Sequence, residues 1–152
     1  MKKFFATILS LILIFSVGCS AEKISEEKIS AEKVEVNEMK IKIFIGEKVF
    51  DAILEENPST REFMKKLPIE VEMTELNGNE KYYKFGEKFP SNDKKIGEIR
   101  VGDLMLYDSS YLVIFYKNFS TSYSYTKLGK IENPANLEKI LGSGNISVRF
   151  EK

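Results

Sequence analysis

The sequence predicts a mostly β domain, in which eight antiparallel strands close a barrel and two short helices cover its ends. Three observations predict this fold. Apolar and polar residues alternate with a period of two in several segments, which is typical of strands with one buried face. Short turn signals separate most of these segments, so neighbouring strands pair as hairpins. The two helical segments do not alternate with the strands, which disfavours a parallel sheet, and closing the barrel removes exposed sheet edges.

The first half of the domain is expected to start near Met39 with two strands and a helix. Residues 39–45 (MKIKIFI) alternate strictly, and a turn at Gly46-Glu47 leads into a second strand at 49–54. Asn57 is a good helix cap, and Pro58 suits the first helical position because its missing N–H has no partner there anyway. The helix ends at Pro68, and its buried face is formed by Phe63, Met64 and Leu67.

A hairpin follows this helix. Residues 69–76 (IEVEMTEL) alternate between apolar and polar side chains, with Ile69, Val71 and Met73 facing the core. Asn77-Gly78 is the strongest short hairpin signal, and it returns the chain through a strand at 80–85 (EKYYKF). A polar loop is expected at 86–95.

The second half contributes four more strands and the second helix. The strands are expected at 104–107, 111–116, 127–131 and 145–151, and the segment 111–116 (YLVIFY) is apolar on both faces, as in a central strand. A Ser/Tyr-rich stretch (NFSTSYSY) precedes the strand at 127–131. The helix is expected to be capped by Asn133, to begin at Pro134 and to end at Gly142, with a buried face formed by Leu137, Ile140 and Leu141.

The N-terminal segment resembles the signal peptide of bacterial lipoproteins. A positively charged start is followed by an apolar run at 4–17, which is shorter than the about 20 residues that a membrane span needs. Small residues then precede Cys19, the only cysteine of the chain. The resemblance implies cleavage before Cys19 and attachment of acyl chains to it. An ordinary secretory signal and an uncleaved anchor are the alternatives.

A charged segment separates Cys19 from the first strand. Residues 20–38 are dominated by Glu and Lys and contain too few apolar residues for a core. We expect a solvated tether, with a membrane-surface helix as the alternative. The expected organisation is therefore a signal peptide at 1–18, a tether at 19–38 and one domain at 39–152.

Composition excludes several function classes. The chain has no histidine and one cysteine, which removes histidine-based catalysis, thiolate zinc sites and internal disulfides. No calcium-loop pattern is present, so we expect neither a metal nor a cofactor. Without Lys2 and Lys3, 21 basic and 23 acidic residues remain, and this net charge of −2 gives no reason to expect nucleic-acid binding. We expect a monomer.

Segments spread over most of the domain resemble the bacterial cyclophilin-like proteins, a group of small barrels related in fold to the peptidyl-prolyl isomerases. They are IFIGEKVFDAILEENPSTREFMKKLPIEVEM, GDLMLYDSSYLVIFYKNF and KLGKIE, and the resemblance extends over residues 39–151. It implies an eight-stranded barrel with two helices. In true cyclophilins an arginine on a barrel strand binds the substrate carbonyl beside an apolar proline pocket, often with a tryptophan and a histidine. Here both of these residue types are absent, and strand 80–85 offers Lys84 in place of an arginine.

Aromatic residues form the best candidate binding surface. Tyrosines exceed what an apolar core favours, because each hydroxyl group needs a partner. Lys84 is the candidate polar group, and ordinary strand preference for aromatics is the alternative explanation. The main candidates for ligand binding are Tyr82, Tyr83, Phe85, Tyr107, Phe115 and Tyr116; the wider aromatic set also includes Phe89, Phe119, Tyr123 and Tyr125.

These observations lead to one expected function and two alternatives. We expect a lipoprotein anchored through Cys19 on the extracytoplasmic face of a bacterial membrane, whose barrel binds a small molecule or a proline-containing peptide without strong catalysis. The first alternative is a weak peptidyl-prolyl isomerase that assists the folding of exported proteins. The second is an accessory envelope protein without a binding pocket.

Overall fold

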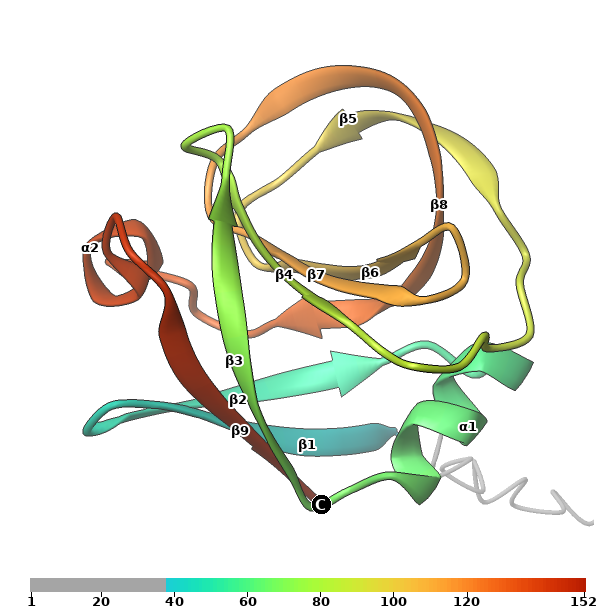
Figure 1. The fold of residues 1–152 in the computed structure, drawn as a ribbon, viewed down its shortest axis with the longest axis horizontal. Helices are drawn as coiled ribbons and strands as arrows, with labels where there is room; N and C mark the ends of the chain where they lie inside the picture. The colour runs from blue at the N-terminus through green and yellow to red at the C-terminus, as the bar shows by residue number, and fades with distance from the viewer. Residues whose placement is uncertain (1–37) are drawn as a thin grey trace, which may run out of the picture. The chain divides into compact units, whose positions relative to one another are not determined.

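The computed structural model describes residues 38–152, so the expected signal peptide, Cys19 and all of the expected tether except Glu38 lie outside the described residues. In the described part, nine strands and two helices follow one another along the chain (Figure 1). They are β1 (Met39–Ile45), β2 (Lys48–Leu54), α1 (Pro58–Lys65), β3 (Ile69–Leu76), β4 (Glu80–Lys84), β5 (Lys94–Ile99), β6 (Asp103–Tyr107), β7 (Tyr111–Phe115), β8 (Phe119–Ile131), α2 (Leu137–Leu141) and β9 (Ile146–Glu151).

Eight of these strands close the predicted antiparallel barrel. Their order is β2-β1-β9-β3-β4-β7-β6-β8, and β8 pairs back with β2 to complete the ring. Gly129 pairs with Leu54 at this closure, and a β-carbon at Gly129 would overlap the carbonyl oxygen of Ile53. The barrel therefore closes at a point where two backbones approach too closely for any side chain.

The ninth strand, β5, lies outside the ring and pairs only with the first half of β8. This differs from the sequence-based prediction, which placed a polar loop up to residue 95 and only a short strand at 127–131. The Ser/Tyr-rich stretch is the first half of a strand of 13 residues. In β5, charged residues and a bulge between Lys95 and Gly97 interrupt the alternation, so the strand has little sequence signal.

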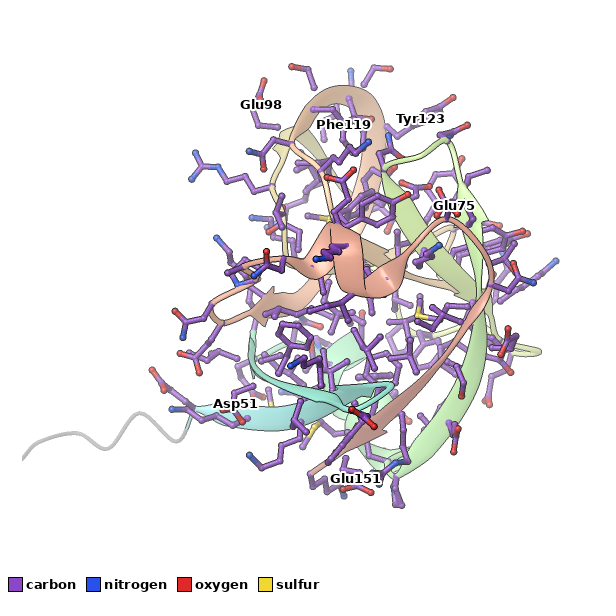
Figure 2. All side chains as sticks on the ribbon, turned by 90° about the vertical axis from the view of Figure 1, so that its left-hand side faces the viewer. Asp51, Glu75, Glu98, Phe119, Tyr123 and Glu151 are labelled. Atoms are coloured by element: carbon purple, nitrogen blue, oxygen red, sulfur yellow. The ribbon has the colours of Figure 1, made fainter. Side chains whose placement is uncertain are left out.

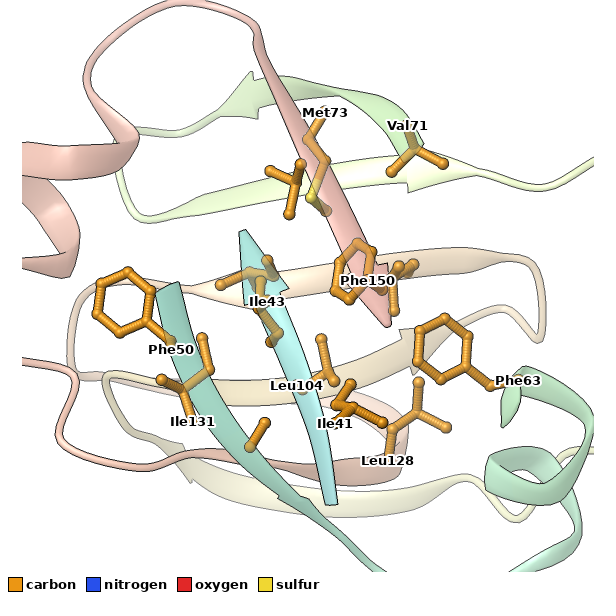
Figure 3. Close-up of a cluster of buried hydrophobic side chains, with 14 of the residues drawn as sticks. Ile41, Ile43, Phe50, Phe63, Val71, Met73, Leu104, Leu128, Ile131 and Phe150 are labelled. Atoms are coloured by element: carbon orange, nitrogen blue, oxygen red, sulfur yellow. The ribbon is translucent and has the colours of Figure 1, made fainter. Parts of the chain in front are cut away.

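The main core fills the barrel interior (Figure 3). Ile41, Ile43 and Phe150 are at most 1% exposed, in agreement with the period-two pattern of their strands. Helix α1 inserts Phe63, whose ring lies edge-on to that of Phe150 with 5.6 Å between centroids. Both helices thus contribute to the same core, and they lie at opposite sides of the barrel in Figure 1.

A second, smaller core lies on the outer face of β4, β7 and β6. We call this group the outer cluster; β5 and the first half of β8 cover it. This cover explains why β7 is buried on both faces, as its sequence predicts. The buried members are Ile99, Met105, Val113, Phe115 and Tyr125.

The two helices differ in how well their starts were predicted. The Asn57 side chain accepts a hydrogen bond from the Thr60 N–H at 2.9 Å, so the predicted cap of α1 is confirmed. The predicted start of α2 is wrong. Asn133 has a left-handed backbone (φ 48°), and the helix begins at Leu137 after a turn in which the Leu137 N–H bonds to the Pro134 carbonyl. Gly142 ends the helix as predicted.

No helix within residues 38–152 combines the length and the apolar character that a bilayer span requires.

Candidate ligand-binding site

A pocket of about 660 Å³ opens on the outer face of the barrel, beside the outer cluster. Its floor comes from β4, β7 and β6, and its wall comes from the first half of β8. Figure 2 labels Phe119 and Tyr123 of this wall at the end of the molecule opposite to Asp51 and Glu151. We call this site the tyrosine pocket, because its lining includes Tyr82, Tyr107, Tyr111, Tyr123 and Tyr125.

Strand register brings these rings together. Side chains alternate between the two faces of a strand, so Glu80, Tyr82 and Lys84 share the outer face of β4. Tyr82 pairs with Val113 on β7, and Tyr111 of β7 pairs with Tyr107 of β6. The ring centroids of Tyr82 and Tyr111 are 5.9 Å apart, and those of Tyr107 and Tyr111 are 6.2 Å apart. Neighbouring strands therefore present a continuous aromatic floor.

Strand β8 completes the aromatic surface from the other side. The ring of Tyr107 lies 5.9 Å from that of Tyr123 and 5.5 Å from that of Tyr125, measured between centroids. Tyr125 is buried, and this burial together with the charge of Glu80 raises the pKa of its hydroxyl group to about 12. At neutral pH the Tyr125 hydroxyl group is therefore protonated.

Glu80 is an unusual lining residue, because its side chain is buried and carries a carboxyl group. It is 9% exposed, and no donor among residues 38–152 forms a hydrogen bond or an ion pair with it. Burial, and next the charge of Glu75, raise the pKa of Glu80 to about 7. The neighbouring Asn79 also lines the pocket, and its Oδ1 atom is buried without a partner in the described chain. The pocket lining therefore holds one buried acceptor without a donor, the Asn79 Oδ1 atom, and one carboxyl group without a partner in the described chain.

The structure brings four of the seven predicted site residues to this face of the barrel. Tyr82 and Tyr107 line the pocket directly. Phe115 lies beneath it in the outer cluster, with its ring edge-on to Tyr125 at 5.5 Å. Lys84 is exposed and outside the lining, and its ammonium nitrogen lies 5.2 Å from the centre of the Tyr111 ring. Lys84 therefore lies at the rim.

The other three predicted site residues lie elsewhere. Tyr83 points to the opposite face of β4 and packs with Phe85, whose centroid is 5.0 Å away, against the barrel core. Phe89 extends this aromatic group, with its ring centroid 4.8 Å from that of Phe85. Tyr116 lies at the end of the barrel near α2 and lines a different pocket. The single aromatic groove expected from the sequence is thus divided over two faces and one end of the barrel.

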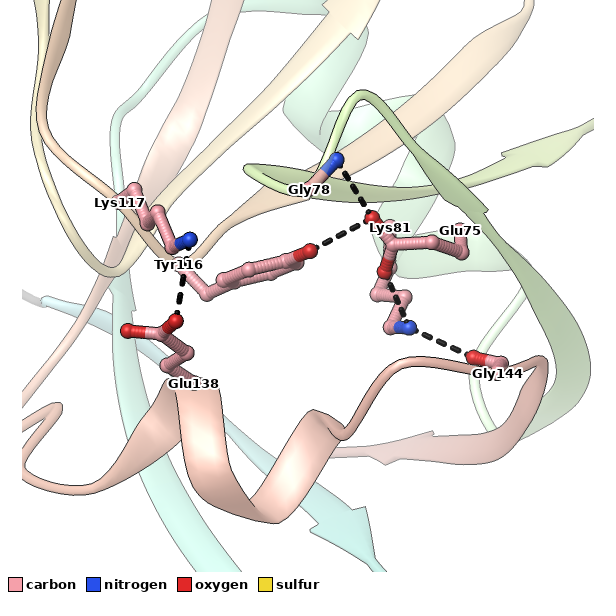
Figure 4. Close-up of polar contacts among 7 residues, drawn as sticks. All are labelled: Glu75, Gly78, Lys81, Tyr116, Lys117, Glu138 and Gly144. Carbon is pink, nitrogen blue, oxygen red and sulfur yellow. Dashed lines mark hydrogen bonds and ion pairs between the residues drawn. The ribbon is translucent and has the colours of Figure 1, made fainter.

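The pocket at Tyr116, of about 780 Å³, is bordered by a buried polar network (Figure 4). Lys81 is fully buried; its ammonium group donates to Glu75 Oε2 at 2.5 Å and to the Gly144 carbonyl at 2.6 Å. Glu75 Oε1 accepts from the Tyr116 hydroxyl at 2.6 Å and from the Gly78 N–H at 2.9 Å. Partial burial opposes ionisation of Glu75, but the bonds from Lys81 and Tyr116 outweigh it and lower its pKa.

Every charged group of this network has partners, which indicates a structural role. The network ties the β3–β4 hairpin to the loop before β9. Because buried charges are stable only when they are paired, the lysine and the glutamate hold each other in place. Little of the network is left to bind a ligand.

The sequence-based candidates did not include several lining residues of the tyrosine pocket, among them Tyr111, Glu80 and Asn79. Period-two alternation was the available signal, since it places Glu80 and Tyr82 on one face of the strand EKYYK and pairs that face with Tyr111. Nothing in the local sequence indicates that Glu80 is buried. Among the described residues, no group of three or more carboxylate, cysteine or histidine side chains is placed to hold a metal ion.

Comparison with known proteins identifies the fold. A comparison with curated protein sequences finds no match. The solution structure of a hypothetical protein from Archaeoglobus fulgidus is similar, with a TM-score of 0.52 and 18% sequence identity over 75% of this chain and 94% of that one. At this identity the likeness concerns the fold alone. The family model described as "Cyclophilin-like family" matches residues 43–151, which is nearly the whole barrel, and the chain therefore belongs to the cyclophilin-like family.

Proposed function

We propose that the protein is a lipid-anchored, extracytoplasmic binding module whose cyclophilin-like barrel holds a small-molecule or peptide ligand in the tyrosine pocket. The observation that carries this proposal is the pocket itself: about 660 Å³ in volume, lined by five tyrosines, and containing polar atoms without partners. Binding sites for small ligands are typically concave and aromatic, with a few polar groups that fix orientation.

The same pocket argues against efficient prolyl isomerisation. Resemblance to true cyclophilins implies an arginine that binds the substrate carbonyl, yet no arginine or lysine occurs among the residues that line the tyrosine pocket. Lys84, at the rim, is a compact charge without the guanidinium fork of arginine. A peptide is therefore bound without strong stabilisation of the twisted amide.

The binding proposal is tested by nuclear magnetic resonance on the full chain, expressed with its leader and purified in a neutral detergent. Titration with proline-containing tetrapeptides is expected to shift the amide signals of Tyr82, Tyr111 and Tyr123, and to leave those of the β1–β2 hairpin unchanged. Shifts confined to other surfaces would refute the assignment of the site. A protease-coupled assay with a prolyl peptide is expected to show turnover far below that of a cyclophilin; equal turnover would support the isomerase instead.

The anchoring proposal rests on the leader that ends at the only cysteine of the chain. Acyl chains on Cys19 would hold the barrel at a membrane, because stable anchoring takes more than one chain. Cys19→Ser is expected to release the protein from the membrane fraction and to abolish labelling by radioactive fatty acid. Ser16→Ala provides the control, because it keeps the thiol. Unchanged fractionation and labelling of Cys19→Ser would contradict a lipid anchor.

A further inference from the structure

We propose that the tyrosine pocket selects an organic ammonium cation, with the positive charge held between the Glu80 carboxylate and the tyrosine rings. This inference rests on the proposed binding function and adds the chemical class of the ligand. Three features of the pocket support it: the balance of charge in the lining, a buried acceptor without a donor, and the arrangement of the aromatic rings.

The lining has negative charge that nothing within it balances. Its acidic side chains are Glu80 and Asp108, and it contains no lysine or arginine. Asp108 is exposed and has a cation nearby, since its Oδ1 atom lies 3.6 Å from the Lys88 ammonium nitrogen. Glu80 has no such partner among residues 38–152, and it is the more buried of the two. An anionic ligand would therefore be repelled, and a cation would supply the missing counter-charge.

The pocket lining also contains a hydrogen-bond acceptor that has no donor in the described chain. A buried acceptor without a donor destabilises the protein, because it has lost its water without gaining a new bond. The Asn79 Oδ1 atom is in this state, and the Glu80 carboxyl group lines the same pocket without a partner among residues 38–152. A ligand that only accepts hydrogen bonds would leave both atoms unchanged. An ammonium ligand places positive charge beside the Asn79 oxygen and the Glu80 carboxylate. If the ammonium group carries N–H bonds, it also donates hydrogen bonds to them.

The aromatic rings provide the second half of the site. The faces of tyrosine rings attract cations, and clusters of such rings bind ammonium groups in other proteins. Outside the lining, at the rim of the pocket, the Lys84 ammonium group lies 5.2 Å from the centre of the Tyr111 ring. Tyr107 lies against Tyr111, Tyr123 and Tyr125 at centroid distances of 5.5 to 6.2 Å. The lining thus contains several tyrosine rings in contact with one another and the Glu80 carboxyl group.

Binding of a cation should depend on pH through Glu80. The charge of Glu75 on β3 acts on Glu80, and the charge of Glu80 in turn acts on Tyr116 after β7 and on Tyr125 of β8. Because burial raises the pKa of Glu80 to about 7, most of the carboxyl is neutral at pH 5.5 and charged at pH 8. If the charged form is the one that binds, cation affinity should rise on the order of tenfold or more between these two values.

Two matched pairs of compounds test the proposal on the full chain in a neutral detergent. Choline and 3,3-dimethylbutanol have the same shape and differ in charge. The peptide N-acetyl-Ala-Lys-Ala-amide and its Nε-acetylated form differ in the same way and represent a lysine side chain as the source of the cation. Tyrosine fluorescence is the readout, since five of the seven tyrosines line the pocket and the chain has no tryptophan.

We expect at least one cation to bind at least tenfold more tightly than its neutral partner at pH 8. Tighter binding of choline indicates a free small molecule as the natural source, and tighter binding of the lysine peptide indicates a protein side chain. Equal affinity within both pairs, or no binding of either cation, would overturn the inference. Neither result would overturn the binding function, which is decided separately by the proline-peptide titration.

Substitution of Glu80 provides a second test of cation binding. Glu80→Gln keeps the size of the side chain and removes its charge, so we expect it to abolish the preference for the cation and the dependence on pH. Glu72→Gln, at an exposed position of β3, is the matched control and should change neither. If Glu80→Gln fails to fold, the pH dependence of the unmodified protein decides: cation affinity that stays constant from pH 5.5 to 8 refutes the role of Glu80.

Discussion

Glu80 makes the stability of the barrel depend on pH in a way that one substitution can isolate. Its carboxyl group is 9% exposed, and its pKa rises from an ordinary 4.5 to about 7 in the folded protein. Between these two values the folded protein keeps a proton that the unfolded chain has released. Stability therefore falls as pH rises through this window, which is the opposite of the usual behaviour of a paired carboxylate.

The size of the effect follows from the two pKa values. One pKa unit corresponds to about 1.4 kcal/mol. The titration of Glu80 therefore lowers the free energy of unfolding by about 3 kcal/mol over the complete window, and by about 2–3 kcal/mol between pH 5 and pH 8. Glu80→Gln is neutral throughout and does not titrate. Relative to the unmodified protein, Glu80→Gln should therefore gain about 2–3 kcal/mol of unfolding free energy as pH rises from 5 to 8.

The assay is urea unfolding at pH 5, 6, 7 and 8, followed by circular dichroism and tyrosine fluorescence. Titrations common to both proteins cancel in the difference, so the comparison reports on Glu80. The exposed Glu72→Gln should show a difference that is nearly constant with pH. A constant difference for Glu80→Gln, or one that changes in the opposite direction, would refute the argument that Glu80 is buried without a partner.

Three further predictions concern the barrel and its polar network. Gly129→Ala should destabilise the protein by about 3 kcal/mol, because its β-carbon would also lie 2.7 Å from the Leu54 Cα atom. Gly86→Ala is the control and should change stability little, because the space around Gly86 is open. Similar unfolding midpoints of the two variants would contradict the tight closure of the barrel. Lys81→Met should lower the unfolding free energy by about 3 kcal/mol, because it leaves the Glu75 carboxylate without its cation. Adding Glu75→Gln should recover about 1 kcal/mol, and additive effects of the two substitutions in urea unfolding would show that the pair is uncoupled. Phe63→Ala should lower the unfolding free energy by about 3–5 kcal/mol, and a loss below about 1 kcal/mol would mean that α1 is not part of the core.

Local patterns in the sequence determined most of the barrel. The alternation in β1 and β3 follows from the two faces of a strand, and these faces are buried or exposed as predicted. Asn77 and Gly78 both have the positive φ angles that a tight hairpin requires, and Asn57 caps α1 through its own side chain. All of these features depend on residues within a few positions of one another, so a single sequence is enough to find them.

Only the tertiary structure decided where the candidate site lies and what it contains. Whether Glu80 is exposed depends on Tyr125, 45 positions later in the chain, and on the first half of β8 folding over the outer face of β4. Tyr83, the neighbour of Tyr82 on the opposite face of β4, packs against the barrel core instead. Periodicity shows that two neighbouring side chains face opposite ways, but it does not show which face a distant strand will cover. The burial of Glu80 among tyrosines is therefore a product of long-range packing.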